Sequence, residues 1–356
     1  MKKTFVIAEA GVNHNGDSAL AFKLCDAAIE AGADAVKFQT FKADKIASAS
    51  APKAAYQKQT TDSKESQLDM LKRLELPEAL HFDLMRYCEK NNIQFLSTAF
   101  DIESLSFLSE KLKLSQFKIP SGEITNAPLL LQYAKTGCPL ILSTGMSTLA
   151  EIEAALSIIA FGMIGGEGPS SNAFKVAYIS EAGQVALQEK VSLLHCTSRY
   201  PTPVKEVNLR AMDTMRDVFN LPVGYSDHTQ GITIPVAAVA RGACIIEKHF
   251  TLDRSLPGPD HKASLLPHEL KAMVAGIREV ECAFGDGVKK PFESELETLR
   301  VARKSIFIDE ALDANHLIRE DDIKILRPGT GLSPMKYWDI LGAPVGEIVE
   351  GEVDDS

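Results

Sequence analysis

Two histidines, His228 and His249, follow short β-type runs at a spacing that could hold one metal ion. Val-Gly-Tyr at 223–225 leads into Ser-Asp-His, and Cys-Ile-Ile at 244–246 leads into Glu-Lys-His. The small and aliphatic residues of 234–243 predict a packed crossover helix between them. A strand–helix–strand unit makes its two strands parallel neighbours, so both strand ends face the same way. A lone histidine is more often a hydrogen-bonded core residue, but two at matched strand ends predict a metal site.

Lysine and hydroxyl side chains also end apolar runs, and together they predict an anion pocket. Lys37 interrupts Ala-Val-Lys-Phe, and Lys118 interrupts Gln-Phe-Lys-Ile. A lysine in such a place either snorkels to water or faces a charged ligand. Neutral hydroxyl donors end other runs, so the set suits a phosphate or a carboxylate. These hydroxyl residues are Thr98, Ser121, Ser143, Ser198 and Ser226.

Glu9 ends the apolar run Val-Ile-Ala, where it either pairs with one of the lysines or holds a metal-bound water. Two imidazoles with few carboxylates leave coordination positions open for substrate oxygens, and a divalent ion there acts as a Lewis acid on a carbonyl. Because zinc normally takes at least three protein ligands, we expect Mn²⁺, with Mg²⁺ as the alternative. We expect His195 and His261 to be structural.

Short apolar runs alternate with amphipathic runs along the chain. The predicted strands are 4–9, 35–39, 94–98, 116–119, 140–143, 192–196, 222–225 and 243–249. The predicted helices are 17–31, 77–91, 103–113, 128–135, 149–160, 208–219, 234–241 and 267–284. Eight strand–helix pairs over roughly 285 residues predict an α/β fold, the (β/α)8 TIM barrel, whose active site lies at the C-terminal strand ends. A doubly wound sheet is the alternative, but no G-x-G-x-x-G turn follows the first strand.

Composition breaks divide the chain into a barrel domain at 1–284, a polar linker at 285–300 and a small β-rich module at 301–356. The module is too small to bury much surface alone, so we expect it to dock on something. Two insertions interrupt the barrel pattern, at 41–75 and at 162–189. The first has a possible short helix near its end. The second carries a glycine cluster that predicts a mobile loop, because no Gly-Lys-Ser/Thr follows it.

The overall charge and the cysteine pattern exclude several classes of partner. The 356 residues carry a formal net charge of −10, whereas nucleic acids and anionic membranes favour basic faces. Six cysteines without a C-x-x-C pair indicate reduced, mostly buried thiols of a cytoplasmic protein. No stretch approaches the roughly 18 apolar residues that a membrane span needs. We therefore expect neither a nucleic-acid nor a membrane partner.

A series of motifs covers nearly the whole chain and resembles the sialic acid synthases, the phosphoenolpyruvate-condensing enzymes of nonulosonic acid synthesis. The motifs are AEAGVNHNG (8–16), VKFQT (36–40), LSTAF (96–100), FKIPSGE (117–123), LSTGM (142–146), HCTSRYPTP (195–203), GYSDHT (224–229), EKHFT (247–251) and GPDHKAS (258–264). The C-terminal module is similar to the antifreeze-like (SAF) domain of that family.

The resemblance implies metal-dependent condensation of phosphoenolpyruvate with N-acetylmannosamine, giving N-acetylneuraminate and phosphate by C–O cleavage. The family's metal ligands match His228 and His249. Its phosphoenolpyruvate contacts match Lys37, Thr98, Lys118, Ser121, Ser143 and Ser226. Its sugar contacts match Gln39, Phe100, Glu123, Tyr200 and Asp260. Catalytic roles are implied for Glu9, which lies near the metal and its water, and for Lys118, Glu123 and the two histidines.

Two further features follow from the resemblance. The family's C-terminal arginine matches Arg327, and there the module of one subunit reaches the barrel of its partner, which implies a domain-swapped homodimer. Ser198 stands where some members carry asparagine beside the phosphate, so a water would have to bridge that contact.

Three other functions stay open on the sequence alone. Within the family, legionaminate synthesis from 2,4-diacetamido-2,4,6-trideoxy-mannose fits the motifs about as well, and the sialic branch is preferred only slightly. A metal-dependent barrel hydrolase would need a further His or Asp ligand set. A non-catalytic sugar-binding protein would leave Lys37 and Lys118 unexplained.

Overall fold

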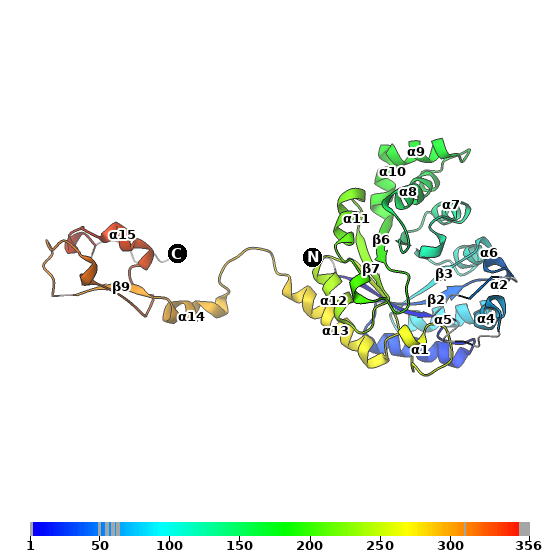
Figure 1. Cartoon of the computed structure of the whole chain (residues 1–356), viewed down its shortest axis with the longest axis horizontal. Helices are drawn as coiled ribbons and strands as arrows, with labels where there is room; N and C mark the ends of the chain where they lie inside the picture. The colour runs from blue at the N-terminus through cyan, green and yellow to red at the C-terminus, as the bar shows by residue number, and fades with distance from the viewer. Residues whose placement is uncertain are drawn as a thin grey trace. The chain divides into compact units, whose positions relative to one another are not determined.

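The computed structural model describes residues 3–48, 51–53, 57, 61, 65–309 and 311–348. It divides into two compact units, Met1–Phe284 and Gly285–Ser356 (Figure 1). Tyr56, part of the first insertion, lies outside the described residues. Within the described part of the chain, no helix combines the length and the apolar character that a membrane crossing requires.

Eight parallel strands form one sheet in the first unit, in the order β3-β2-β1-β8-β7-β6-β5-β4. The strands are β1 (Phe5–Gly11), β2 (Ala35–Thr40), β3 (Gln94–Ala99), β4 (Phe117–Ile119), β5 (Leu140–Ser143), β6 (Val191–Cys196), β7 (Val223–Asp227) and β8 (Ile245–His249). The two ends of this order, β3 and β4, also lie against each other, so the sheet is a nearly closed barrel. The predicted (β/α)8 fold is confirmed, and the doubly wound alternative is wrong.

Helices surround the strands (Figure 1). They are α1 (Ser18–Ala31), α2 (Ala43–Ile46), α4 (Gln67–Leu74), α5 (Glu78–Lys90), α6 (Ile102–Ser106), α7 (Ala127–Lys135), α8 (Leu149–Met163), α9 (Ser171–Ile179), α10 (Glu181–Lys190), α11 (Ala211–Phe219), α12 (Thr233–Ala240) and α13 (Pro267–Ala283). Local signals set the ends of α1. The Asp17 side chain accepts hydrogen bonds from the first-turn amides, and Gly32 takes the left-handed conformation at φ 75°.

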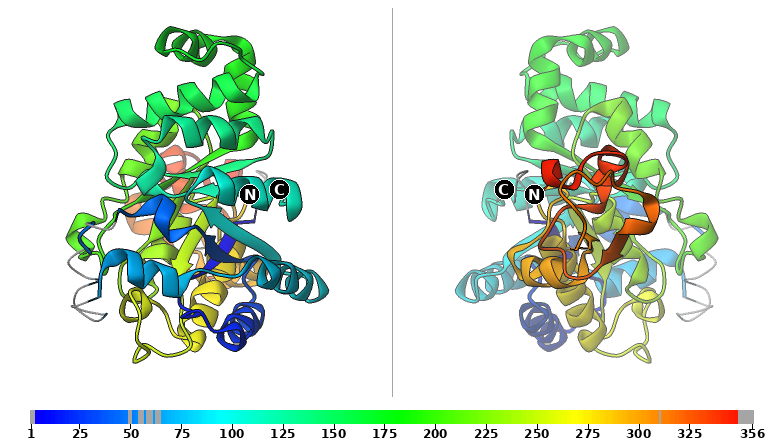
Figure 2. Two further views of the ribbon diagram at one scale, coloured as in Figure 1. Left: turned by 90° about the vertical axis from the view of Figure 1, so that its right-hand side faces the viewer. Right: turned by 90° about the vertical axis from the view of Figure 1, so that its left-hand side faces the viewer.

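The second insertion differs from the sequence prediction. Only its glycine cluster is a loop, and two helices, α9 and α10, follow it and pack against α8. Both have serine N-caps: the Ser170 hydroxyl accepts from the Ala173 amide, and the Ser180 hydroxyl accepts from the Gly183 amide. In Figure 1 and Figure 2, α9 lies outside the helices that cover the strands.

The alternation of side chains along the strands separates two cores. One face of each strand packs against the helices in a large apolar cluster. The other face points into the barrel, where a second cluster fills one layer with Ile7, Ala35, Leu96, Ile141, Leu194 and Ile245. Because side chains repeat with a period of two, the next inward residues come two positions later. These are polar residues such as Glu9, Lys37 and Thr98, so the same alternation that builds the apolar layer places a polar layer above it.

The second unit holds a short antiparallel pair, β9 (Ser305–Ile308) and β10 (Ile323–Leu326), with α14 (Glu293–Ala302), α15 (Tyr337–Ile340) and α16 (Val345–Ile348). Helix α14 begins inside the predicted linker, and the unit has less β-structure than we expected for 301–356. Among its described residues, the buried apolar side chains are Ile306, Ile318 and Ile340. This unit therefore has little core of its own.

Gly224 lies in β7 at a point where an added methyl group has no room. A Cβ built there would lie 2.5 Å from the backbone oxygen of Ile245 and 2.7 Å from the Leu194 side chain. We expect Gly224→Ala to lower the free energy of unfolding by about 1–3 kcal/mol through overpacking. The matched control is Gly276→Ala in α13, where the nearest atom is a Val236 methyl at 3.4 Å. Removing that helix glycine is expected to stabilise by roughly 0.5–1 kcal/mol. Urea denaturation followed by circular dichroism measures both, and equal stabilities would contradict the packing inside the barrel.

Candidate active site

A cavity of about 310 Å³ opens at the C-terminal ends of the barrel strands. Most of the residues that the sequence singled out line it. They are Glu9, Lys37, Gln39, Thr98, Phe100, Lys118, Ser121, Ser143, Ser198, Tyr200, Ser226, His228, His249 and Asp260. The barrel thus brings together side chains from all eight strands or from the loops that follow them.

Four buried charged groups form the floor of the cavity. Lys37 Nζ lies 2.6 Å from Glu9 Oε2 and 3.6 Å from Glu247 Oε2. Lys118 Nζ lies 3.2 Å from Glu247 Oε1. Each of these side chains is only 3–6% exposed. The two lysines and two glutamates balance in formal charge, which is how such groups can be buried without a ligand.

Glu247 is a site residue that the sequence reasoning missed. Its carboxylate also accepts a hydrogen bond of 3.0 Å from the Ser226 hydroxyl, so it connects β7 to the lysines of β2 and β4. Its position in the strand could have identified it. Glu247 precedes His249 by two residues in β8, and side chains two residues apart in a strand point to the same face, here into the barrel.

The two glutamates have opposite pKa shifts. Burial raises the pKa of Glu9 to about 7, although Lys37 opposes that shift. Burial also acts to raise the pKa of Glu247, but Lys118 and Lys37 outweigh it and hold that pKa well below the ordinary value. Near neutral pH, Glu247 is therefore a fixed anion, whereas Glu9 exchanges a proton readily. Two carboxyl groups whose surroundings drive their pKa values apart are typical of acid–base chemistry.

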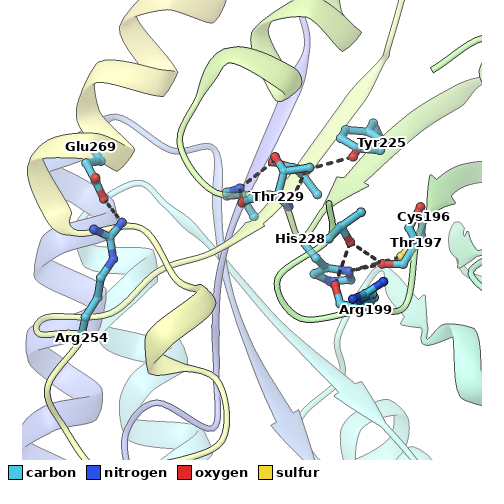
Figure 3. Close-up of polar contacts among 11 residues, drawn as sticks. Cys196, Thr197, Arg199, Tyr225, His228, Thr229, Arg254 and Glu269 are labelled. Carbon is cyan, nitrogen blue, oxygen red and sulfur yellow. Dashed lines mark hydrogen bonds and ion pairs between the residues drawn. The ribbon is translucent and has the colours of Figure 1, made fainter. Parts of the chain in front are cut away.

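The two imidazoles lie side by side in the cavity, with ring centroids 5.7 Å apart. His228 Nδ1 donates to the Thr197 carbonyl over 2.8 Å (Figure 3), so Nε2 is the nitrogen that the neutral ring offers to a metal. Burial acts to lower the pKa of His228, but the Cys196 thiol and the Thr197 carbonyl outweigh it and raise that pKa. His249 Nδ1 is buried and has no hydrogen-bond partner among the described atoms. Burial and the neighbouring His228 hold the pKa of His249 well below its ordinary value, so this imidazole is neutral, the form that binds metals.

This donor set fits a metal with open coordination positions. Across the described ranges, no group of three or more His, Cys, Asp or Glu side chains could hold a metal ion. Two imidazoles alone do not satisfy the usual zinc shell, so oxygen ligands from outside the protein must complete the coordination. The Tyr200 ring covers this pair, 4.0 Å from the His228 ring and 5.9 Å from the His249 ring.

Hydroxyl groups gather on the β4–β6 side of the cavity. The Ser121 hydroxyl accepts a 2.9 Å hydrogen bond from the Gly145 amide, and a Cβ at Gly145 would lie 2.3 Å from Ser198 Oγ. Glycine is therefore needed at 145 for both hydroxyls to approach the chain. Ser143 Oγ is buried without a hydrogen-bond partner among the described atoms. An unsatisfied buried hydroxyl in a cavity is suited to donate to an anionic ligand.

The opposite side of the cavity is apolar. Its residues come from the β1 and β3 ends and from the first insertion, with the Phe41 and Phe100 rings packed edge to face at 6.1 Å. The remaining members are Val12, Ile46, Met70, Leu71 and Leu74. We call this set of seven the apolar wall. The cavity therefore combines a charged floor with a surface suited to methyl groups.

Two predicted site residues lie elsewhere. Glu123 follows the cavity residues Ser121 and Gly122, but it does not line the cavity, and its carboxylate accepts from Asn126 Nδ2 over 2.7 Å. Arg327 belongs to the second unit and follows β10 directly. Their predicted roles stay predictions.

His195 and His261 have structural partners. His195 Nε2 contacts the Val207 carbonyl at 2.6 Å, and His261 Nδ1 contacts the Thr251 hydroxyl at 2.7 Å. Neither lines the cavity.

Comparisons with known proteins show which family and which solved fold the chain resembles. The model of the NeuB family matches residues 24–289. The N,N'-diacetyllegionaminic acid synthase of Campylobacter jejuni is 49% identical over 342 residues, which are 96% of this chain and 96% of that protein. The protein of the same name from Legionella pneumophila is 47% identical and is matched over 95% of this chain and 89% of its own length. The crystal structure of N-acetylneuraminic acid (sialic acid) synthetase from Leptospira borgpetersenii has a TM-score of 0.67 at 34% identity, over 84% of this chain and 90% of that one.

Asp260 is a buried carboxyl in the cavity, and burial raises its pKa from 3.8 to about 6. Because the folded pKa exceeds the unfolded one, wild-type stability falls as the pH rises from about 4 to about 6 and stays lower above that range. Asp260→Asn cannot ionise. We therefore expect it to be more stable than wild type by on the order of 2 kcal/mol at pH 8, and equally stable near pH 4. Urea denaturation at both pH values measures the difference. Asp217→Asn, which removes an exposed carboxylate, is the control; the same pH dependence there would contradict a burial effect.

Proposed function

Because this chain belongs to the NeuB family, we propose that it condenses phosphoenolpyruvate with 2,4-diacetamido-2,4,6-trideoxy-mannose to give N,N'-diacetyllegionaminate and phosphate. The observation that carries the proposal is the similarity, over nearly the whole chain, to two legionaminic acid synthases. The sequence motifs alone slightly favoured N-acetylmannosamine as the sugar. The relatives support the alternative better, and we adopt it here.

The chain is a nonulosonic acid synthase, an enzyme that forms a carbon–carbon bond from phosphoenolpyruvate. A metal-dependent hydrolase or a non-catalytic sugar-binding protein is therefore set aside. Members of this family differ in the sugar that they use. We therefore look in the cavity for the residues that determine sugar specificity.

The apolar wall supports the trideoxy sugar. That sugar carries a methyl group at C6 and an acetamido group at C4, where N-acetylmannosamine carries a hydroxymethyl and a hydroxyl group. Phe41, Phe100 and Leu71 offer these methyl groups an apolar surface but no hydrogen bonds for hydroxyl groups. One added methylene in an apolar pocket is worth about 1–3 kcal/mol, or roughly 10–200-fold in kcat/KM.

The charged floor suits phosphoenolpyruvate. In our proposal Lys37 and Lys118 bind its carboxylate and phosphate, and the hydroxyls of Thr98, Ser143 and Ser226 donate to the same oxygens. The Lys37 ammonium already donates to Thr98 Oγ1 over 3.0 Å. Binding of an anion beside Glu9, whose pKa is about 7, favours the protonated form of Glu9 and so reduces repulsion.

His228 and His249 would hold the divalent metal, and we propose Mn²⁺, with Mg²⁺ as the alternative. When bound, this ion supplies Lewis-acid polarisation of the sugar aldehyde. The protein groups around the two imidazoles position them, and Asp260 and Gln39 lie where they could contact sugar hydroxyl groups.

The chemistry then balances without a further reactant. The electron pair of the enol double bond joins C3 of phosphoenolpyruvate to the aldehyde carbon, whose oxygen takes the proton that we assign to protonated Glu9 and becomes a hydroxyl. Water then adds at C2, where positive character has developed, and one of its protons restores Glu9. The new C2 hydroxyl forms the ketone as the bond between C2 and the phosphate oxygen breaks, and the hydroxyl proton leaves with phosphate. Pre-organised charges of this kind contribute several kcal/mol, on the order of 3–4 per donor.

The second unit has a proposed role in the same site. We assign 301–356 to an antifreeze-like (SAF) module and propose a homodimer in which Arg327 of each subunit contacts the sugar in the barrel of the other. The small core of this unit supports a docked arrangement. We also keep a cytoplasmic location as a prediction.

The sugar preference is tested by phosphate release with both sugars at equal concentration, in the presence of phosphoenolpyruvate and Mn²⁺. We expect kcat/KM for the trideoxy sugar to exceed that for N-acetylmannosamine at least tenfold, which is about the effect of one additional methylene in an apolar pocket. Leu71→Gln should reduce this ratio, whereas Val218→Gln on the exposed face of α11 should leave it unchanged. A preference for N-acetylmannosamine would replace the legionaminate assignment by the sialic one.

The swapped arrangement is tested by co-expressing His228→Ala with Arg327→Ala, each inactive alone. In a swapped dimer, a mixed pair has one site in which both residues are native. We expect roughly a quarter of wild-type activity, because half of the dimers are mixed and each has one intact site of two. If each module served its own barrel, every site would keep one defect and the mixture would stay inactive.

A further inference from the structure

We propose that the buried ion pair between Asp227 and Lys248 is a positioning device that sets the spacing of the two metal-binding imidazoles. Asp227 directly precedes His228, and Lys248 directly precedes His249. In the parallel register of β7 and β8, Asp227 and Lys248 are direct partners. The inference rests on the metal site of the proposed function and goes beyond it, because neither residue lines the cavity.

The pair lies on the outer face of the barrel. Since side chains alternate along a strand, the residues that follow two inward-facing positions, Ser226 and Glu247, must point toward the helices. Both charged side chains are 0% exposed, and Lys248 Nζ lies 2.5 Å from Asp227 Oδ2. Most of the residues that pack between strands and helices belong to the large apolar cluster, although the charges of Glu269 and Arg254 also act on Lys248. Burying two charges in this layer costs free energy, so we expect the pair to have a role beyond packing.

Every polar atom of the pair has partners. Asp227 Oδ1 accepts from the Tyr225 hydroxyl over 2.9 Å and from the Thr229 amide over 3.0 Å. Asp227 Oδ2 accepts from the Thr229 hydroxyl over 3.0 Å, and the Lys248 ammonium also donates to the Thr229 carbonyl. Figure 3 shows dashed lines that start from the labelled Tyr225 and Thr229, close to the labelled His228.

These contacts link the two metal-binding imidazoles. Asp227 and Thr229 flank His228 on both sides, and Lys248, the residue before His249, contacts both of them. One network thus fixes the backbone around the first imidazole relative to the second. A buried ion pair is weak as a source of stability, because an apolar replacement of equal volume is often as stable. Its directed contacts are what an apolar pair could not supply.

The distance between the two imidazoles should have a large effect on metal affinity, because the protein offers few metal ligands. With two imidazoles, no third protein donor in the described residues compensates when one moves. Partners that orient metal ligands from outside the coordination shell typically change metal affinity 10–100-fold when removed. The Asp227–Lys248 pair should act on metal affinity in this way, although it contacts neither metal nor substrate.

The test compares metal affinity with stability. The double variant Asp227→Asn/Lys248→Met removes both charges with little change in volume, and Asp227→Glu keeps the charge but lengthens the side chain. The control, Arg278→Met, breaks a partly buried ion pair with Asp34 beside the start of β1, in which Arg278 also binds the Thr4 carbonyl. Mn²⁺ binding to the metal-free full-length protein is measured from the electron paramagnetic resonance signal of free Mn²⁺, and melting temperature is measured by circular dichroism.

We expect both Asp227 variants to raise the Kd for Mn²⁺ at least tenfold, and Arg278→Met to lower the melting temperature with a Kd within twofold of wild type. If the double variant does not fold, Asp227→Glu decides the question. A Kd within twofold of wild type in the folded variants would overturn the positioning role and leave the proposed function intact. Wild-type protein that fails to bind Mn²⁺ would overturn the proposed metal site together with this inference.

Discussion

Two lysines and two glutamates are buried together at one end of the barrel, and the rest of the structure depends on their mutual neutralisation. Burying any one of these charges alone would cost several kcal/mol, so each requires its neighbours. The closed sheet supplies them by bringing Glu9 and Lys37 from adjacent strands and Lys118 and Glu247 from opposite sides of the ring. The balance is uneven: burial outweighs Lys37 at Glu9 and raises its pKa to about 7, whereas Lys118 and Lys37 together outweigh burial at Glu247 and lower its pKa. A bound anion would enter this balance as a competitor of the glutamates.

The barrel strands carry two polar networks that are separated by one residue along the chain. In β8, Glu247 faces the cavity and contacts the lysines, whereas Lys248 faces the helices and contacts Asp227. The pleat of the strand keeps these charges on opposite faces, so a cation and an anion adjacent in sequence do not pair with each other. In our proposal the inner network binds substrate and the outer one holds the strand ends in register, so the position of His249, the residue after Lys248, would depend on both.

The sequence predicted the strands and most of the cavity because both follow from short-range patterns. A side-chain period of two and a parallel sheet are enough to predict that Lys37 and the two histidines, each at the end of a strand, face the same cavity. Glu247 was missed although its spacing from His249 places it on the cavity face, because its partner Lys118 lies across the ring and no spacing rule predicts that ion pair. Helices α9 and α10 were not predicted, although Ser170 and Ser180 are good N-caps, because the glycines before them favoured a loop for the whole insertion. The role that we propose for Arg327 would need a contact outside its own unit, which no local pattern encodes.

The charged floor and the apolar wall of the cavity come from different parts of the fold. The charged floor comes from the strands, where a shift of one residue would turn every inward side chain to the helices. The apolar wall comes largely from the segment after β2, with Phe41, Met70 and Leu71 on elements outside the sheet. If the wall selects the sugar as we propose, a change in it would alter which sugar is favoured without disturbing the register or the charge balance of the floor. On this proposal one carbon–carbon bond-forming site could serve sugars that differ in methyl and acetamido groups, because the reacting groups and the selecting surface come from different parts of the fold.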